Sequence, residues 1–586
     1  MPKDKPAAGA TPDTTSSAKP PKLPKPKPSL PTHPSLGKIT VFPARRILTM
    51  CDANPVADAV AVADGRVVAV GSMKDIQPWL DRWDHEVDRR FRKKFILPGF
   101  VDAHVHPSLP AVLSNFPFLA PEDWDLPTGH FPGARTPKAY VARLRELAAK
   151  HDDPSMPFVC WGFHPLWHGE QYRPRLDELF PDKPVVLWHR SFHEVVLNGA
   201  ALKHFGLEES AVRGRPETDW DKGHFWENGA TLVLSKLAGW LFQPERYANG
   251  IATFFEMAHR AGVTTCLDMG IGIFGDASGE ARLILETAEA RRVPVRAILT
   301  PTQFDFLTRG QGPQQAFEQA ERWASEIKSR RVFLDRHFKL QIDGAIYGGL
   351  SQVGFPGYLD GHSGMWMAPP EVFYEYALPF WNAGYQIHAH VNGDLSADLF
   401  IDIVRRLQQA KPRLGHRATL EHFAYATEDQ VRQMKELGIL VSGNPYYHRI
   451  LGDPMSSDWL GPDRARGLVP FGSLERAGVP FALHSDCPMA PLSPLELASC
   501  AASRTTIDGR SLGPEDRTTV LAALRAITID AAWILRRENE IGSIRPGKKA
   551  DFAILEDDPT RVGAKRLRDV EVWGTVFEGE IHPVSR

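Results

Sequence analysis

The stretch FILPGFVDAHVHP, residues 95–107, is an apolar run that becomes polar toward its end. In a β-strand, alternation places Asp102, His104 and His106 on one face and Ala103 and Val105 on the other. The two histidines are either metal ligands at the end of a buried strand or a chance pair, because H-x-H is a short pattern. The rest of the chain has to decide between these alternatives.

Short apolar segments that read as strands recur after this stretch, and helical segments separate several of them. The strands are expected at 263–270, 337–344, 385–394, 418–423, 438–445 and 480–486, and the helices at 245–261, 276–291, 314–329 and 395–410. Alternating strands and helices are typical of a parallel α/β fold, and a chain of 586 residues is long enough for a barrel with a smaller unit. We therefore predict an α/β protein with a (β/α)8 TIM-like barrel over residues 98–535.

Both ends of the folded chain have the character of β-structure. The segment AVAVADGRVVAVGS, residues 59–72, contains an Asp64-Gly65 pair that favours a tight hairpin turn. GSIRPGKKADFAILEDDP (542–559) and DVEVWGTVFEGEI (569–581) are also β-rich with glycine turns. We expect one small β-sandwich built from residues 38–97 and 536–586 together.

A large insertion, residues 107–250, interrupts the strand–helix rhythm after the first barrel strand. It holds seven of the fifteen tryptophans of the chain, namely Trp124, Trp161, Trp167, Trp188, Trp220, Trp226 and Trp240. We expect most of them to form an aromatic core of the insertion and a minority to line an apolar substrate pocket. Trp161 is our candidate among them for binding substrate.

Composition limits the partners and the location of the protein. The net charge of −2 argues against a nucleic-acid partner, and no apolar run is long enough to span a membrane. Five scattered cysteines argue against a disulfide framework and a cysteine-based zinc site. The N-terminus lacks an apolar signal segment, so we expect a cytoplasmic enzyme. Residues 1–37 are rich in proline and lysine and are expected to be a disordered tail.

Polar side chains gather at the ends of the expected strands. In FKLQIDG, Lys339 shares a face with Gln341, and a lysine directed into a barrel is costly unless it is paired or modified. In QIHAHVNGD, His388 and His390 share the inner face. Since chemistry in such barrels takes place at the C-terminal ends of the strands, these residues are expected at one mouth.

Two later strands complete the set. In LEHF, Glu421 and His422 have opposite parity, so we expect only one of them to point inward. Asp486 ends the strand that contains LHSD. A lone buried histidine is more often a hydrogen-bonded core residue than a ligand, but histidines, a lysine and an aspartate on successive strand ends are ligand types suited to Zn²⁺.

The motifs of the chain resemble those of the amidohydrolase superfamily over residues 38 to 586. Within it they are similar to the YtcJ-like branch, amidohydrolase family 3, which includes N-substituted formamide deformylases. The motifs that carry the resemblance are LPGFVDAHVHP, FHEVVLNGAAL, FKLQIDGAI, HVNGD, LEHF, HSDCPMAPLSPL and IGSIRPGKKADFAIL. The chain departs from the family after H-x-H, where residues 108–129 are rich in proline and aromatic residues, and we expect this segment to form a wall of the substrate pocket.

The resemblance implies a metal site with one or two divalent ions such as zinc. Its ligands would be His104, His106, Lys339, His390, His422 and Asp486. Lys339 matches a family lysine that becomes carboxylated and then bridges two metals, although some members of the superfamily work with one. Asp486 would also accept a proton from the attacking water. His193 matches a histidine on the insertion that hydrogen-bonds or polarises the substrate, or alternatively pins the insertion to the barrel.

The resemblance also implies an enzyme that hydrolyses carbon–nitrogen bonds other than peptide bonds. The expected substrates are small N-acyl or N-formyl amines with an apolar or aromatic group, and His388 and Glu227 join His193 and Trp161 as candidate substrate-binding residues. Ester, carbamate or lactone hydrolysis and a non-hydrolytic decarboxylase or isomerase remain alternatives. A non-catalytic scaffold is the least favoured alternative, because such proteins typically lose metal ligands, whereas this chain keeps the expected set. Dimers are common among members of the family, so the resemblance also implies a possible homodimer.

Overall fold

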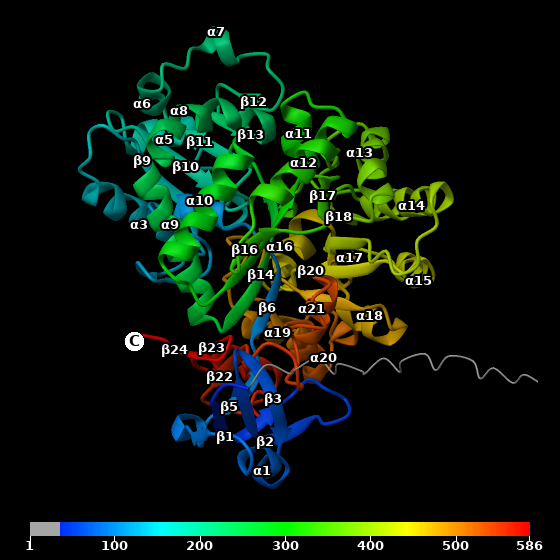
Figure 1. Cartoon of the computed structure of the whole chain (residues 1–586). Helices are drawn as coiled ribbons and strands as arrows, with labels where there is room; N and C mark the ends of the chain where they lie inside the picture. Colours follow the sequence, from blue (N-terminus) through cyan, green and yellow to red (C-terminus); the bar gives the residue numbers. More distant parts are fainter. Residues whose placement is uncertain (1–35, 586) are drawn as a thin grey trace, which may run out of the picture.

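The computed structural model describes residues 36–585, so most of the proline-rich tail predicted for residues 1–37 lies outside the described residues. Two groups of parallel strands with helices around them form the centre of the molecule (Figure 1). Among the described residues, none of the helices is both long and apolar enough to cross a membrane.

The central strands pair in two parallel groups. The first contains β6 (Phe100–Val105), β14 (Val263–Ile271) and β15 (Arg296–Pro301), with the short β16 (Val332–Leu334) at its edge. The second contains β17 (His337–Gln341), β18 (Gln386–Val391), β19 (Thr419–His422), β20 (Leu440–Gly443) and β21 (Phe481–Leu483).

The two groups meet at both edges. An isolated parallel bridge joins Thr302, just after β15, to Lys339 of β17. At the other edge, the backbone N–H of Asp486 donates to the carbonyl of His104 at 2.9 Å. The strands therefore form a barrel in which the ends that carry His104, Lys339 and Asp486 lie at the same mouth.

Helices follow the strands and cover the outside of the barrel. α10 (Ala277–Ala290) follows β14, α12 (Pro313–Glu326) precedes β17, α13 (Pro370–Asn382) precedes β18 and α14 (Asp394–Ala410) follows it. Their buried residues recur at helical spacing, as in Phe400, Ile403, Val404 and Leu407 of α14. Several predicted strands are shorter than expected, because Asp343 lies in the loop beyond β17, residues 392–393 lie in the turn beyond β18, and Asp394 already begins α14.

Both ends of the described chain contribute to one sheet at the base of the barrel (Figure 1). Along its main path the strand order is β24 (Glu580–Pro583), β23 (Val572–Phe577), β22 (Phe552–Leu555), β5 (Phe95–Pro98), β1 (Ile39–Leu48), β2 (Val56–Ala63) and β3 (Arg66–Gly71). The turn predicted at Asp64-Gly65 is confirmed: both residues have positive φ, of 51° and 73°.

Gly99 is the junction between this sheet and the barrel. It joins β5 to β6, and its N–H donates to the carbonyl of Asp551 at 2.8 Å. A Cβ at this position would lie 2.1 Å from Oγ1 of Thr264, so only glycine allows the two units to approach this closely.

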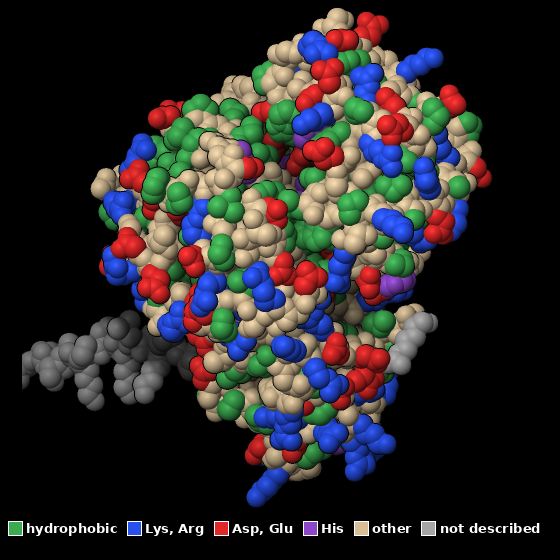
Figure 2. All heavy atoms as spheres, turned by 180° about the vertical axis from the view of Figure 1, so that it is seen from behind, with side chains coloured by type: hydrophobic (Ala, Val, Ile, Leu, Met, Phe, Trp, Pro, Cys, Tyr) green, Lys and Arg blue, Asp and Glu red, His purple; other side chains and the backbone are tan. Residues whose placement is uncertain are grey.

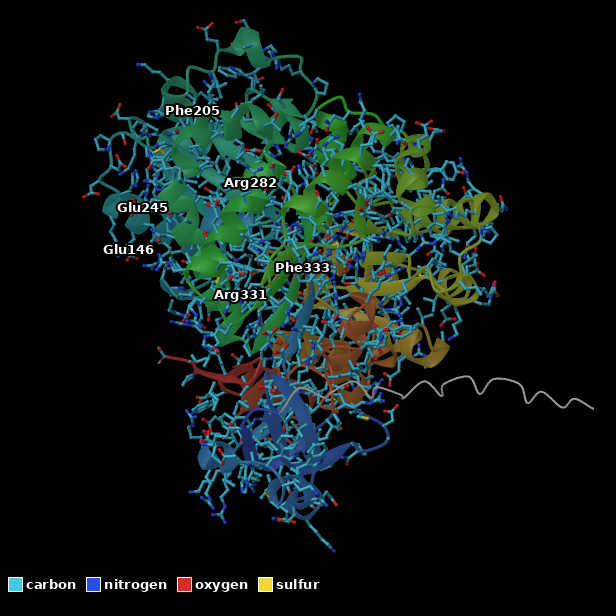
Figure 3. The ribbon with its side chains drawn as sticks, in the orientation of Figure 1. Glu146, Phe205, Glu245, Arg282, Arg331 and Phe333 are labelled. Atoms are coloured by element: carbon cyan, nitrogen blue, oxygen red, sulfur yellow. The ribbon has the colours of Figure 1, made fainter. Side chains whose placement is uncertain are left out.

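The insertion after β6 forms a second sheet above the barrel mouth. It contains β9 (Phe158–Phe163), β10 (Val185–His189) and β11 (Glu194–Leu197), extended by β13 (His224–Trp226) and β12 (Thr218–Asp219). In Figure 3, Phe205, after α6 (Gly199–His204), lies near the top of this part and Glu146, in α3 (Pro137–Lys150), lies at its side, whereas Arg331 lies lower, toward the β-rich unit.

The two faces of the insertion sheet belong to different apolar clusters. Phe158, Cys160 and Leu187 face a cluster confined to the insertion, whereas Trp161 and Trp188 face the cluster that is continuous with the barrel core. Trp124, Trp161 and Trp188 are therefore buried core residues, as expected for most of the tryptophans, but they lie in the cluster that the insertion shares with the barrel and not in one of its own. The strand period of two directs these large rings toward the barrel, where they fix the insertion in place.

Candidate metal centre and substrate cavity

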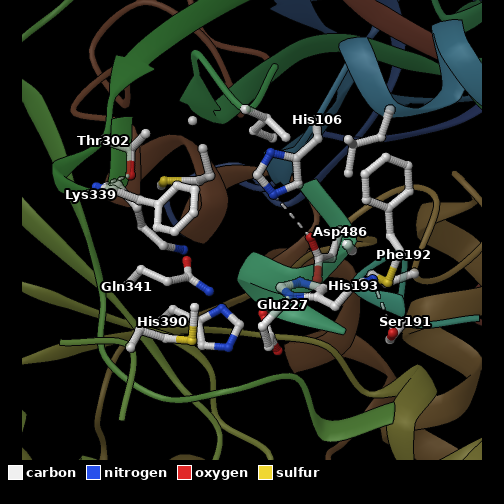
Figure 4. A pocket seen from close by; sticks show the side chains of 18 of the residues that line it. His106, Ser191, Phe192, His193, Glu227, Thr302, Lys339, Gln341, His390 and Asp486 are labelled. Carbon is white, nitrogen blue, oxygen red and sulfur yellow. Dashed lines mark hydrogen bonds and ion pairs between the residues drawn. The ribbon is translucent and has the colours of Figure 1, made fainter. Parts of the chain in front are cut away.

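Three polar side chains converge at the closing edge of the barrel. His104 and His106 come from the end of β6, and Asp486 lies three residues beyond β21. The Nε2 atoms of the two histidines are 3.2 Å apart. Oδ1 of Asp486 lies 3.4 Å from Nε2 of His104 and 3.3 Å from Nε2 of His106. Figure 4 shows the contact between His106 and Asp486 as a dashed line. Two ring nitrogens and a carboxylate oxygen directed at one point form a donor set typical of a divalent cation.

Two further histidines lie beside this group. The ring centroid of His422, from the end of β19, lies 4.7 Å from that of His104 and 4.2 Å from that of His390, from β18. Nε2 of His422 is buried without a hydrogen-bond partner. A buried ring nitrogen with no partner is costly, and a bound cation would satisfy it.

The backbone at two of these positions is in the left-handed region. His422 has a φ of 73° and Asp486 a φ of 53°, values that are uncommon for residues other than glycine. Our expectation that only one of Glu421 and His422 points inward is wrong for this reason. The positive φ of His422 interrupts strand alternation, so that both side chains reach the inside of the barrel.

Among residues 36–585, Lys339, on β17, is the only lysine or arginine that lines the cavity. Its side chain is 2% exposed, and Nζ has no hydrogen-bond partner. Burial lowers the pKa of this lysine to about 8, although Glu421 and Asp486 act in the opposite direction. A larger fraction of its amine is therefore neutral and nucleophilic near neutral pH than in an exposed lysine, although the ammonium form still predominates.

Glu421 is a functional candidate that we did not predict. It is fully buried, and its two oxygens lie 2.9 Å from Nδ1 of His104 and 2.6 Å from Nδ1 of His388. Because a carboxylate only accepts, both Nδ1 atoms must donate, which leaves Nε2 of His104 with its lone pair directed at the cation position. The sequence signal for Glu421 was its position directly before the candidate ligand His422. We did not use this signal, because strict strand alternation predicted that only one of the two residues points inward.

Tyr447 is a second residue that the sequence did not indicate. Its hydroxyl donates to Oδ2 of Asp486 at 3.1 Å and lies 3.2 Å from Nδ1 of His422. It lies on α16 (Tyr446–Pro454), after β20, where no motif or strand parity marks it. This bond leaves Oδ1 of Asp486 toward His104 and His106.

His193 reaches the site from the insertion. Its Nδ1 pairs with Oε2 of Glu227 at 2.8 Å, and both residues line the same cavity as Lys339 and His390 (Figure 4). Burial lowers the pKa of His193, but the charge and the hydrogen bond of Glu227, together with the nearby carboxylates of Glu194 and Asp486, outweigh it and the net pKa is raised. The ion pair fixes the ring so that Nε2 remains to contact a substrate.

The cavity at the barrel mouth has a volume of about 180 Å³. Its wall is mainly apolar apart from the residues already described, and it includes Leu109, Phe192, Leu234, Met269, Ile273, Phe304, Met367 and Met489. Figure 2 shows histidine atoms inside a hollow in the upper half of the molecule, close to apolar side chains. The site thus combines a polar floor with an apolar wall.

Two predicted substrate-binding residues do not line the cavity. The ring of Trp161 packs on Phe118 and lies 4.8 Å from the Arg190 guanidinium, and none of the tryptophans in the described part of the chain lines the cavity. His388 is fully buried behind the site, between Glu421 and His337. Trp161 serves to pack the insertion, and His388 serves to hold Glu421. The apolar character that we assigned to tryptophans comes from Phe, Met, Leu and Ile side chains instead.

Comparison with known proteins agrees with this architecture. A family model described as "Amidohydrolase family" matches residues 92–582. The chain is 27% identical over 562 residues to an N-substituted formamide deformylase of Arthrobacter pascens, covering 90% of this chain and 95% of that protein. It is 23% identical to the putative amidohydrolase YtcJ of Bacillus subtilis (strain 168), covering 91% and 97% of the two chains.

A solved structure has the same fold. An uncharacterized metal-dependent hydrolase from Pyrococcus horikoshii OT3 superimposes with a TM-score of 0.68 at 18% identity, covering 93% of this chain and all of that one. The α/β barrel predicted from the sequence is thereby confirmed, and so is the family resemblance that the motifs indicated.

Proposed function

We propose a substrate class and a mechanism from one premise: this chain belongs to the amidohydrolase family and is a metal-dependent hydrolase of carbon–nitrogen bonds. The proposed substrates are small, uncharged N-formyl or N-acyl amines with an apolar substituent on nitrogen. The observation that carries the proposal is the convergence of His104, His106 and Asp486 at the floor of an apolar cavity. The name of the formamide deformylase of Arthrobacter pascens agrees with this class.

The residues present fit a metal centre. Nε2 of His104 and Nε2 of His106 would hold one ion together with Asp486, and His390 and His422 would hold a second with Lys339 between them. The nitrogen and oxygen donors and the unpartnered Nε2 of His422 suit Zn²⁺. Such a cation, when bound, lowers the pKa of water and polarises the scissile carbonyl.

Lys339 is the proposed bridge between the two positions. As a free ammonium it would repel both cations, and no acidic group pairs with its Nζ. Its lowered pKa makes the neutral amine available to add carbon dioxide, which forms an N–C bond and releases one proton. The resulting carbamate is an anion with two oxygens. Carboxylation would thus replace the costly buried ammonium of Lys339 with a metal ligand.

Asp486 and His193 are the proposed catalytic residues. Asp486 accepts the proton of the attacking water and transfers it to the leaving nitrogen, because an amine must leave protonated. His193, held by Glu227 at 2.8 Å, donates from Nε2 to the carbonyl oxygen as negative charge develops there. Tyr447 fixes the rotamer of Asp486 through Oδ2.

The charge of the cavity supports a neutral substrate. Apart from Lys339 and histidines, none of the described residues that line it carries a cationic side chain. A carboxylate on the substituent would therefore be buried beside Leu234, Ile273 and Phe304 without a partner, at a cost of several kcal/mol. We expect N-formyl and N-acyl amino acids to be poor substrates compared with the corresponding amines.

The test is amine release from matched N-formyl, N-acetyl and N-aroyl amines and amino acids, with apo protein beside protein reconstituted with zinc and bicarbonate. We expect release only from the metal form, and much faster release from the uncharged amines than from the amino acids. In Asp486→Asn, turnover should be lost while most of the metal stays bound. Full activity of this variant would remove Asp486 from its role, and hydrolysis of esters or carbamates alone would move the activity to a C–O bond.

A further inference from the structure

Arg190 is an unusual residue of the insertion, because its guanidinium is completely buried between two segments of the site. It follows β10 directly, and its side chain has no exposed surface. Nε and Nη2 donate to Oε1 of Glu122 at 2.9 and 2.5 Å. Nη1 donates to the carbonyl of Pro488 at 3.2 Å and Nη2 to that of Met489 at 2.9 Å.

The carbonyl of Met489 has a second donor. The hydroxyl of Tyr347, in the short 3₁₀ helix η3 (Ile346–Gly348) after β17, donates to it at 2.9 Å. The Arg190 guanidinium lies 4.7 Å from the ring of Tyr347 and 4.8 Å from that of Trp161, so aromatic faces complete its surroundings. The backbone just beyond Asp486 is therefore held by two buried donors that come from different parts of the chain.

Both segments that Arg190 contacts reach the cavity. After Arg190, the chain continues through Ser191 and Phe192 to His193, and all three line the cavity. On the other side of Arg190, Asp486 and Met489 belong to the segment that it holds, and both also line the cavity. Arg190 is thus the direct connection between the segment that presents His193 and the segment that presents Asp486.

We propose that Arg190 is a positioning residue that fixes the separation of His193 and Asp486. This rests on the proposed function, in which these two residues act on the carbonyl oxygen and on the water from different sides. A planar guanidinium bonds to one carboxylate and two carbonyls at once, which a lysine ammonium on a flexible stem cannot reproduce in the same geometry. The insertion is then a working part of the catalytic site and not only a cover over it.

The test compares Arg190→Lys and Tyr347→Phe with a matched control, Arg504→Lys. Arg504 is also buried, and its guanidinium donates to three carbonyls, those of Leu512, Val469 and Arg466, but it does not line the cavity. We expect kcat to fall at least about 10-fold in Arg190→Lys, since small misplacements at a reacting centre are this costly. KM should change less than kcat, and metal content should stay at the wild-type value.

Tyr347→Phe removes one hydrogen bond without burying a new charge, so it tests the proposal where Arg190→Lys folds poorly. It should lower kcat several-fold, whereas Arg504→Lys should lower the melting temperature and leave kcat unchanged. An equal loss of kcat in Arg504→Lys, or an unchanged kcat in Arg190→Lys and in Tyr347→Phe, overturns the proposal.

Amide hydrogen exchange keeps this result separate from the proposed reaction. Peptides covering residues 190–194 and 486–490 should both exchange faster in Arg190→Lys and not in Arg504→Lys, whatever the substrate is. Unchanged exchange in these two peptides overturns the positioning role. Wild-type protein that is inactive on the whole amide panel would contradict the proposed function, and the exchange data would still decide on Arg190.

Discussion

Replacing Glu421 with glutamine tests how the barrel prepares its metal ligands. Glutamine keeps the size and one acceptor oxygen, but its amide N–H₂ faces either Nδ1 of His104 or Nδ1 of His388, which now lie 2.9 and 2.6 Å from the carboxylate. An N–H cannot face an N–H, so one imidazole must change tautomer. If His104 changes, its Nε2 gains a proton and loses the lone pair that the cation needs.

The size of the effect follows from these contacts. Partners that orient a ligand histidine contribute about 10- to 100-fold to metal affinity, which corresponds to about 1.4–2.8 kcal/mol. We expect a loss of this size in Glu421→Gln, measured by zinc titration of apo protein against a chromophoric chelator. The matched control is Glu578→Gln, since Glu578 is also a buried carboxylate but pairs with Arg296 and Lys549 at the base of the barrel.

Two results would refute this reasoning. Zinc affinity in Glu421→Gln within about twofold of wild type would mean that the carboxylate does not set the tautomer of His104. An equal loss of affinity in Glu578→Gln would mean that the effect is a general loss of stability. Thermal melts of both variants in the apo form show how far the fold itself is weakened.

Three further variants test other parts of the site. Lys339→Ala should reduce bound metal from two equivalents per chain to one or fewer; metal analysis that finds the same content removes the bridge. Burial raises the pKa of Glu280 from 4.5 to about 7, so the folded protein retains a proton that the unfolded chain releases, and stability falls by up to about 3 kcal/mol as the pH rises from about 4.5 to 7. Glu280→Gln should therefore gain stability over wild type in urea unfolding at pH 8 but not at pH 4.5, and an equal difference at both pH values contradicts this. Leu234→Arg should raise the kcat/KM for N-formyl amino acids relative to that for N-formyl amines by about tenfold or more, because the new guanidinium can form a charge-assisted hydrogen bond with the substrate carboxylate. An unchanged ratio of the two kcat/KM values argues against the wall at Leu234 as the site of the substituent.

Sequence periodicity predicted the parts of this protein that depend on local patterns. The strand ends at His104, Lys339 and His390 could be placed because apolar residues alternate before them, and the Asp64-Gly65 turn because that pair tolerates positive φ. Neither pattern shows which side chains meet across the barrel.

The remaining features depend on contacts between distant segments. The positive φ of His422 lets Glu421 and His422 both point inward, and nothing in LEHF signals this. Tyr447 reaches Asp486 from a helix that follows another strand, and Arg190 reaches Met489 from the insertion. Trp161 looked like a pocket residue because aromatic rings are common in pockets, but the face of its strand directs it into packing.

The pairing of β5 with β22 has a consequence for how the protein is made. Leu97 lies opposite Ala553 in this sheet, so the early strands cannot complete their hydrogen bonds until almost the whole chain has been synthesised. At ordinary rates of translation this delay is on the order of tens of seconds. During that time the edge of β5 and its apolar side chains lack their partner strand, which is the state in which nascent chains associate wrongly or are held by chaperones. Truncation before β22 would make this state permanent, although such a chain would still contain every residue that we assign to the metal centre.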